Sequence, residues 1–183
     1  MNYKNIKDVP IKLARLLSYN KILRKNEEII LERPSLDEYY IKIAEAVSLR
    51  STCLKKHYGA VIVKNGEIIS TGYNNPPRGE KHCTKCTKCD NGKDEATYLS
   101  CPSVHAEQNA IISASRNEML GADLYLAGFE INGETAKAID AWPCEICLRL
   151  IKNAGIDSII NRAGPIYTKF GGKLIQCKSK ETE

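Results

Sequence analysis

Two short motifs carry the residue types of a metal site. His105-Ala-Glu107 supplies one imidazole and one carboxylate, and Pro143-Cys-Glu-Ile-Cys147 supplies two thiols. One imidazole and two thiolates are three zinc ligands, and they leave the fourth tetrahedral position open for water. Bound zinc lowers the pKa of that water to about 7, and Glu107 is near enough to His105 in sequence to move the released proton. The pattern predicts a catalytic zinc on His105, Cys144 and Cys147, with Glu107 as general acid and base.

Each motif alone has a simpler interpretation. A lone His-x-Glu is common by chance, and a lone Cys-x-x-Cys also occurs in redox pairs and in half of a structural zinc site. Here both motifs occur in this order, and each stands at the start of a predicted helix. Together they form the signature of zinc-dependent nucleobase deaminases, so we favour a catalytic site.

The remaining cysteines indicate a second metal. The chain has eight cysteines and no secretory signal pattern, so we expect the cytoplasm, where clustered thiols bind metals more often than they form disulfides. Residues 74–103 form a loop of roughly 30 residues with no apolar period, which is long for a compact domain. A structural zinc would fix this loop. Its candidate ligands are Cys53, Cys83, Cys86, Cys89 and Cys101. The alternative is unpaired loop thiols, which is also the prediction for Cys177.

Periodicity and capping signals place these motifs in a single α/β domain. Ser35 with Glu38 predicts the start of a helix, and Asn65-Gly66 predicts a hairpin turn. The expected elements are a helix over 36–50, strands over 59–63 and 68–72, a helix from 103 to about 116, a strand over 122–127, a helix over 144–154 and a strand over 156–160. This order predicts a mixed sheet with crossover helices.

The two ends of the chain are set apart from this domain. We expect an N-terminal extension over 1–35, a deaminase domain over 36–177 and a C-terminal tail over 178–183. The extension could contain an amphipathic helix around Ile11 to Leu23, or it could be a frayed segment.

Composition argues against two classes of protein. The chain has 183 residues, 43% of them hydrophobic and 27% charged, without the roughly 20 uninterrupted apolar residues of a membrane span. The net charge is +5, but residues 1–35 carry +4 of it, which leaves the remainder nearly neutral. A nearly neutral body lacks the distributed basic surface expected for binding duplex nucleic acid.

Several sequence blocks resemble deoxycytidylate (dCMP) deaminases over about residues 36–162. The blocks are Arg50-Ser-Thr-Cys53, Gly59-Ala-Val-Ile-Val-Lys64, Ile69-Ser-Thr-Gly-Tyr-Asn74, Pro77-Arg-Gly79, His82-Cys83, His105-Ala-Glu-Gln-Asn-Ala-Ile111 and Pro143-Cys-Glu-Ile-Cys147. The resemblance implies a cytidine deaminase-like three-layer α/β/α sandwich with a central mixed sheet of about five strands. It also implies hydrolysis of a C–N bond of a cyclic amidine: water adds to C4 of dCMP, Glu107 protonates N3 and then the departing amine, and ammonia leaves to give dUMP.

The resemblance further implies how the substrate is held. The Ala106 backbone N–H would contact the pyrimidine O2, and Asn74 would reach the sugar. Candidates for the phosphate are Arg50, Ser51, Lys55 and Lys56, for which a solvated basic turn is the alternative. Trp142 either lines the pocket or packs against the sheet. For the second zinc, the resemblance favours Cys53, Cys83 and Cys101 with one of Cys86 or Cys89.

Regulation and assembly follow from the same resemblance. Regulated members respond to dCTP and dTTP through a block that ends in Gly, where this chain has Asn75. A homo-oligomer, commonly a hexamer, is expected. Cytidine and dCTP remain alternative substrates. The rival functions are a nucleic-acid deaminase acting on tRNA adenosine or single-stranded cytosine, and a non-catalytic binding module held together by zinc.

Overall fold

The computed structural model of the chain describes residues 23–25, 28–30, 33–86 and 101–168. The chain divides into two compact units, Met1–Leu36 and Asp37–Glu183. In the first, β1 (Leu23–Lys25) pairs antiparallel with β2 (Glu28–Ile30). Leu23 therefore begins a strand, and the rest of the helix predicted around residues 11–23 lies outside the described residues.

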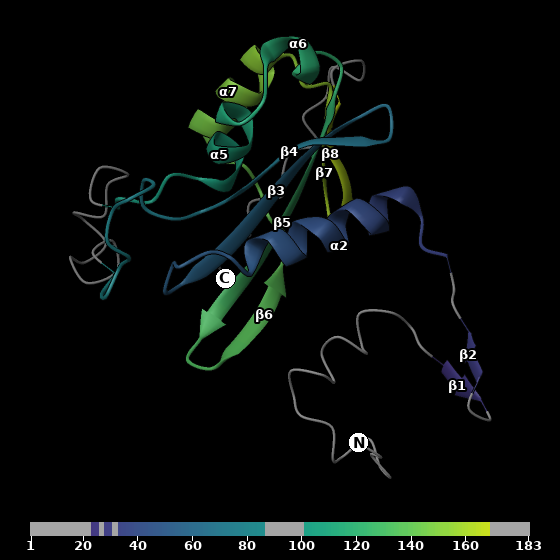
Figure 1. The fold of residues 1–183 in the computed structure, drawn as a ribbon, viewed down its shortest axis with the longest axis horizontal. Helices are drawn as coiled ribbons and strands as arrows, with labels where there is room; N and C mark the ends of the chain where they lie inside the picture. The colour runs from purple at the N-terminus through teal and green to yellow at the C-terminus, as the bar shows by residue number, and fades with distance from the viewer. Residues whose placement is uncertain (1–22, 26–27, 31–32, 87–100, 169–183) are drawn as a thin grey trace, which may run out of the picture. The chain divides into compact units, whose positions relative to one another are not determined.

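The second unit is built on a six-stranded mixed sheet of order β4-β3-β5-β7-β8, with β6 paired to β5 (Figure 1). The strands are β3 (Lys56–Lys64), β4 (Glu67–Tyr73), β5 (Asp123–Asn132), β6 (Thr135–Ile139), β7 (Ser158–Asn161) and β8 (Gly164–Thr168). The β5–β7 pair is parallel, and the other pairs are antiparallel.

Helices cover both faces of this sheet (Figure 1). Helix α2 (Leu36–Ser48) packs on one face, against a core that includes Val61, Val63 and Tyr125. The other face packs against α5 (Ala106–Ile112), α6 (Arg116–Met119) and α7 (Glu145–Ala154). The predicted three-layer α/β/α sandwich is confirmed.

Alternation along the strands assigns each side chain to one face. In β3, Val61 and Val63 face α2, whereas Ala60 and Ile62 join the core beneath α5 and α7. Both sets are nearly or fully buried. This is expected for a strand that is covered on both faces, because the sequence of such a strand is a continuous run of apolar residues. Even-numbered positions of β3 and β5 therefore lie on the α5 and α7 face.

Three features differ from the predicted elements. The helix predicted from 103 to about 116 is shorter, because α5 ends at Ile112. A separate helix, α6, begins at Arg116, where Ser115 caps it by accepting a hydrogen bond from the Glu118 backbone N–H. Strand β6 was not predicted, although Asn132-Gly133 carries a turn signal and Gly133 has a φ of 59°. Strand β8 was not predicted either. It contains Pro165, which is tolerated because β8 is the last strand in the sheet order.

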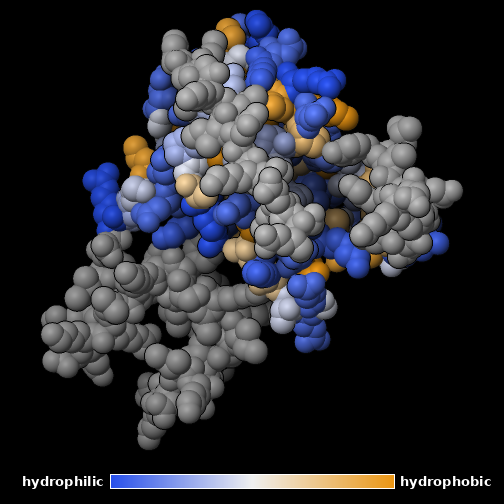
Figure 2. Space-filling model, turned by 180° about the vertical axis from the view of Figure 1, so that it is seen from behind, coloured by the Kyte–Doolittle hydropathy of each residue, from blue (hydrophilic) through white to orange (hydrophobic). Residues whose placement is uncertain are grey.

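The face of the described residues that Figure 2 shows is largely hydrophilic. Seen from behind, the described part of the chain shows hydrophobic side chains in separate patches between hydrophilic ones (Figure 2). Among the described residues, no helix combines the length and apolar character that crossing a membrane requires.

Candidate active site

The first helix that bears site residues, α5, is anchored on β4. Ser70 donates a hydrogen bond to the Ala110 carbonyl (2.8 Å), and Asn109 Nδ2 donates one to the Tyr73 carbonyl (2.8 Å). His105 is the N-cap residue, and its backbone N–H donates to Gln108 Oε1 (2.9 Å). These bonds fix the helix start, and with it the position of the His105 imidazole.

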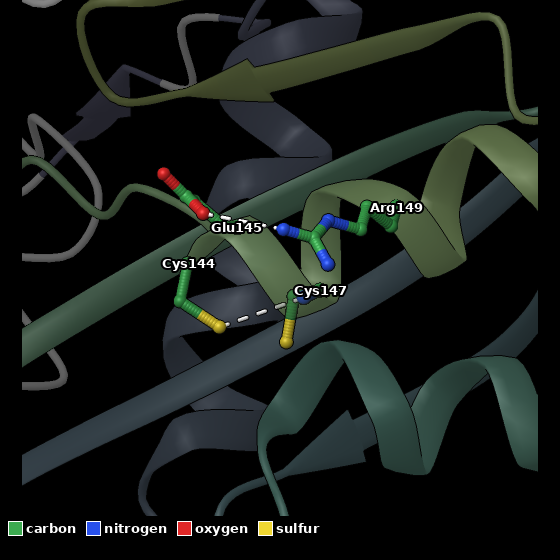
Figure 3. Close-up of polar contacts among 4 residues, drawn as sticks. All are labelled: Cys144, Glu145, Cys147 and Arg149. Carbon is green, nitrogen blue, oxygen red and sulfur yellow. Dashed lines mark hydrogen bonds and ion pairs between the residues drawn. The ribbon is translucent and has the colours of Figure 1, made fainter. Parts of the chain in front are cut away.

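The second helix, α7, begins at the two predicted thiols. Cys144 is the N-cap, and its Sγ accepts a hydrogen bond from the Cys147 backbone N–H (3.5 Å). Figure 3 shows the side chains of Cys144 and Cys147 on the same side of the helix start, whereas Glu145 points toward Arg149, with which it forms an exposed ion pair (3.4 Å). The helix ends at Gly155, whose φ of 85° suits glycine.

The three predicted ligands converge. His105 Nδ1 lies 3.5 Å from Cys144 Sγ and 3.3 Å from Cys147 Sγ, and the three ligand atoms lie within 4.8 Å of one another. A tetrahedral zinc with bonds of about 2.0 Å to nitrogen and 2.3 Å to sulfur separates such atoms by about 3.5 Å. The residues present therefore fit a zinc ion, with Nδ1 as the ligand atom of His105.

Glu107 lies buried beside these ligands. Its side chain is 4% exposed. Burial raises the pKa of the Glu107 carboxyl, against hydrogen bonds from its own backbone N–H and the Cys147 thiol. Burial and the Glu107 charge in turn raise the pKa of the Cys147 thiol well above its ordinary range. A metal ion at this position would lower the pKa of the Cys147 thiol, because the metal binds the thiolate.

Asn74 joins the ends of β3 and β4. Its Oδ1 accepts a hydrogen bond from the Tyr58 backbone N–H (2.7 Å), and its Nδ2 donates to the Lys56 carbonyl (2.9 Å). The Ser51 hydroxyl donates to the Asn74 carbonyl (2.7 Å). The structure thus brings together Ser51, Lys56 and Asn74, three of the predicted substrate-binding residues.

The other predicted substrate-binding residues differ in exposure. Ala106 is fully buried at the start of α5, while Arg50, Lys55 and Lys56 are exposed. Trp142 is 37% exposed and stands two residues before Cys144. Their contacts with a substrate remain predictions.

Four of the five cysteines proposed for a second metal line one cavity. They are Cys53, Cys83, Cys86 and Cys101. Burial raises the pKa of the Cys83 thiol, and charges on Cys101, Cys53 and Cys86 add to this effect. Cys89 and Cys177 lie outside the described residues. Among the described residues, the set brought within 4.8 Å as possible metal ligands is His105, Cys144 and Cys147, so the four cavity thiols are spaced more widely.

Tyr58 is a residue of the same sheet face that the sequence analysis did not single out. It lies on the face of β3 that carries Ala60 and Ile62, and it packs against the same core. Burial, followed by the charge of Glu107, raises the pKa of Tyr58 to about 12. The alternation of β3 could have placed its side chain on the face that carries the zinc ligands.

A mixed sheet with two helices that deliver one histidine and two cysteines beside a buried glutamate is typical of zinc-dependent deaminases. Residues 34–162 match the family described as the cytidine and deoxycytidylate deaminase zinc-binding region, and the chain belongs to this family.

Named relatives agree with this family. A deoxycytidylate deaminase of Mycobacterium phage D29 is 34% identical over 136 residues, which cover 71% of this chain and 96% of the phage protein. A deoxycytidylate deaminase of Saccharomyces cerevisiae is 34% identical over 145 residues, covering 76% of this chain and 42% of the yeast protein. The dCMP deaminase of cyanophage S-TIM5, solved in apo form, has a TM-score of 0.51 and 29% identity, covering 72% of this chain and 85% of that one. The same phage enzyme in complex with dCMP and dUMP has a TM-score of 0.50 and 28% identity, covering 71% and 82%.

Proposed function

We propose that this protein is a zinc-dependent dCMP deaminase, which hydrolyses dCMP to dUMP and ammonia. The observation that carries the proposal is the buried Glu107, 4% exposed, beside a set of three ligands that leaves one zinc position open. A purely structural zinc site has no use for a buried carboxylate able to exchange protons. The relatives named above are dCMP deaminases, and one was solved with dCMP and dUMP bound.

In this proposal the zinc is held by His105, Cys144 and Cys147. When bound, it lowers the pKa of a water molecule to about 7, which supplies a nucleophile at neutral pH. Glu107 would take one proton from that water and deliver it to N3 of the pyrimidine as the oxygen bonds to C4. It would then take the second proton from the O–H group on C4 and deliver it to the amine, and the C4–N bond would break to release ammonia. The balance is one water consumed and one ammonia released for each dCMP. Burial raises the pKa of the Glu107 carboxyl above its ordinary value. In this proposal the same carboxyl acts first as general base and then as general acid.

Substrate orientation uses groups around the start of α5. The Ala106 N–H would donate to the pyrimidine O2. Asn74 would contact the sugar, and because its Oδ1 already accepts one bond from the Tyr58 N–H, the sugar hydroxyl would use the second lone pair of that oxygen. Arg50, Ser51, Lys55 and Lys56 are the proposed phosphate contacts, with Trp142 lining the pocket.

We also propose a second, structural zinc in the thiol-lined cavity. Cys53, Cys83 and Cys101 with one of Cys86 or Cys89 would form a closed site of four thiolates. Four of these five cysteines line one cavity, which supports the proposal. Metal binding would bring the sulfurs to ligand distance.

Regulation, assembly and compartment are proposed from the family resemblance. dCTP and dTTP are the candidate effectors. Asn75, in place of the usual glycine, donates through Nδ2 to the Pro76 carbonyl (2.6 Å) and accepts from Asn109 Nδ2 (3.4 Å), so its side chain is tied into this segment. We propose a homo-oligomer, with a hexamer as the expected assembly, working in the cytoplasm.

The test is ammonia release across dCMP, CMP, dCTP, deoxycytidine, cytosine and short single-stranded DNA and RNA. We expect dCMP to have the highest kcat/KM and Glu107→Ala to remove the activity. Activity confined to the oligonucleotides would assign a nucleic-acid deaminase instead, and no ammonia from any of these compounds would contradict catalysis.

A further inference from the structure

A row of three residues crosses the sheet on the face that packs against α5 and α7. Tyr58 of β3 is paired with Gly128 of β5, which is paired with Ile139 of β6. These three strands lie side by side (Figure 1). The preceding rows on the same face, Ala60 with Leu126 and Ile62 with Leu124, are buried in the core beneath α5 and α7. The row of Tyr58 is thus the first beyond that packed core.

The missing side chain of Gly128 makes room for the Tyr58 ring. A β-carbon at Gly128 would lie 2.8 Å from Cδ1 and Cε1 of Tyr58, and 3.2 Å from Cγ1 of Ile139. The φ of Gly128 is not positive, so the backbone does not require glycine there. Glycine is required at this position because the Tyr58 ring approaches the β5 backbone so closely. The Tyr58 ring therefore lies over the β5 backbone and beside Ile139, and together they form an apolar surface.

Two contacts connect this apolar surface to residues of the proposed site. The Tyr58 backbone N–H is held by Asn74 Oδ1 (2.7 Å), so the residue proposed to contact the sugar also fixes the strand that carries the ring. Tyr58 packs on the core that includes Ala106 and Ala110 of α5, the helix that carries Glu107. Burial raises the pKa of Tyr58, and the charge of Glu107 adds to this effect. The side chain of Tyr58 is half-buried, and its hydroxyl has no hydrogen-bond partner among the described residues.

The partly buried Tyr58 ring thus lies on the sheet face that packs against α5 and α7, in the strand that is held by the amide proposed to reach the sugar. Rings of this kind stack on nucleobases and contribute roughly 1–3 kcal/mol per base in single-stranded nucleic-acid complexes, which corresponds to about 5- to 150-fold in affinity. We propose that Tyr58 contacts the substrate and that its ring forms the wall against which the pyrimidine packs. This inference rests on the proposed function.

The test compares Tyr58→Phe, Tyr58→Leu and Tyr58→Ala in the zinc-loaded full chain. Tyr58→Phe keeps the ring, so its kcat/KM for dCMP should stay within about 3-fold of the wild type. Tyr58→Leu and Tyr58→Ala should lose roughly 5- to 100-fold, mainly through a higher KM. Phe129→Ala is the matched control, because Phe129 neighbours Gly128 on the opposite face of β5 and should change kcat/KM by less than about 3-fold.

A binding measurement separates the wall from a structural role. By calorimetry, Tyr58→Leu should lower the affinity for dUMP by a similar factor. The affinity for deoxyribose 5-phosphate, which lacks the base, should stay unchanged. Gly128→Ala should push the Tyr58 ring aside and lower the affinity for dUMP. When Gly128→Ala is added to Tyr58→Ala, it should cause no further loss of affinity. Equal loss for both ligands, or unchanged dUMP affinity in Tyr58→Leu, would overturn the inference. A wild-type protein inactive on dCMP would contradict the proposed function, whereas an active one with unaffected Tyr58 variants would contradict the wall alone.

Discussion

Gly72 of β4 lies directly against the backbone of Ala106 at the start of α5. A β-carbon at position 72 would stand 2.2 Å from the Ala106 carbonyl oxygen and 2.4 Å from the Ala110 backbone nitrogen. The helix that carries His105 and Glu107 therefore packs on the strand without an intervening side chain. The position of the zinc ligand depends on this contact.

We expect Gly72→Ala to displace α5 and to weaken zinc binding. Neither close atom belongs to a flexible side chain, so the helix itself must move, at a cost of at least about 1–3 kcal/mol. Gly59→Ala is the matched control, because its β-carbon would meet the Ala44 carbonyl at 2.0 Å on the opposite face of the sheet. Both variants should unfold at lower denaturant concentration. Only Gly72→Ala should release zinc to a chelator faster than the wild type, and equal release from both would contradict the prediction.

Glu107→Gln should abolish most of the activity while the protein keeps its fold and its zinc. The amide has the shape of the carboxylate but cannot carry the proton, so kcat should fall by at least about 10²-fold. Glu145→Gln is the control, since its exposed ion pair with Arg149 lies outside the ligand set and should change kcat by less than about 2-fold. The measurements are ammonia release and zinc content by elemental analysis. A near-normal rate in Glu107→Gln would remove this residue from the mechanism.

The thiol-lined cavity and the proposed catalytic site together predict two zinc ions per chain. Cys83→Ser should reduce the zinc content to one and lower the melting temperature, because the binding energy of a structural zinc is also folding energy. Cys177→Ser, which alters a cysteine outside the proposed ligand pool, should leave both values unchanged. A single zinc in the wild-type protein prepared without chelators would disprove the second site.

Burial of Tyr58 predicts a pH dependence of stability. Its pKa is raised from 10.0 to about 12 by burial first and by the Glu107 charge next, so the folded state keeps the proton that the unfolded state loses. The stability that comes from the neutral phenol is complete below pH 10.0 and is lost as the pH rises toward about 12. The free energy of unfolding should therefore fall more steeply over this interval in the wild type than in Tyr58→Phe. Parallel curves would contradict the placement of this phenol.

Much of the fold followed from local signals in the sequence. Ser35 with Glu38, the Asn65-Gly66 turn and Gly155 marked boundaries within a few residues of those of α2, the β3–β4 hairpin and α7. The set of three residues that could hold a metal ion was also predictable, because imidazole and thiolate at helix starts restrict both the metal and the geometry. Local chemistry and tertiary structure agree at these positions.

Other features depend on contacts between distant segments. Strand β8 has five residues including Pro165, so it becomes a strand only by pairing with β7. The Asn74 amide was predicted to reach the sugar, but its bonds to the β3 backbone could not be read from the sequence. The position of Tyr58 over Gly128 required the register of β3 and β5, which no local pattern specifies.

Phosphate recognition can be tested residue by residue. A charge-assisted contact contributes roughly 1.5–3 kcal/mol, so dCMP should exceed deoxycytidine by about 10- to 100-fold in kcat/KM for a single such contact. Arg50→Ala, Lys55→Ala and Lys56→Ala should each be compared with Lys64→Ala, which alters the far end of β3, where Lys64 Nζ donates to the Asn117 carbonyl (3.2 Å). At least one of the first three variants should reduce the preference for dCMP over deoxycytidine without changing the rate on deoxycytidine. Lys64→Ala should leave this preference unchanged. Because these cations are exposed, the wild-type preference should also shrink as salt is raised. Equal kcat/KM for dCMP and deoxycytidine in the wild type would refute phosphate recognition altogether.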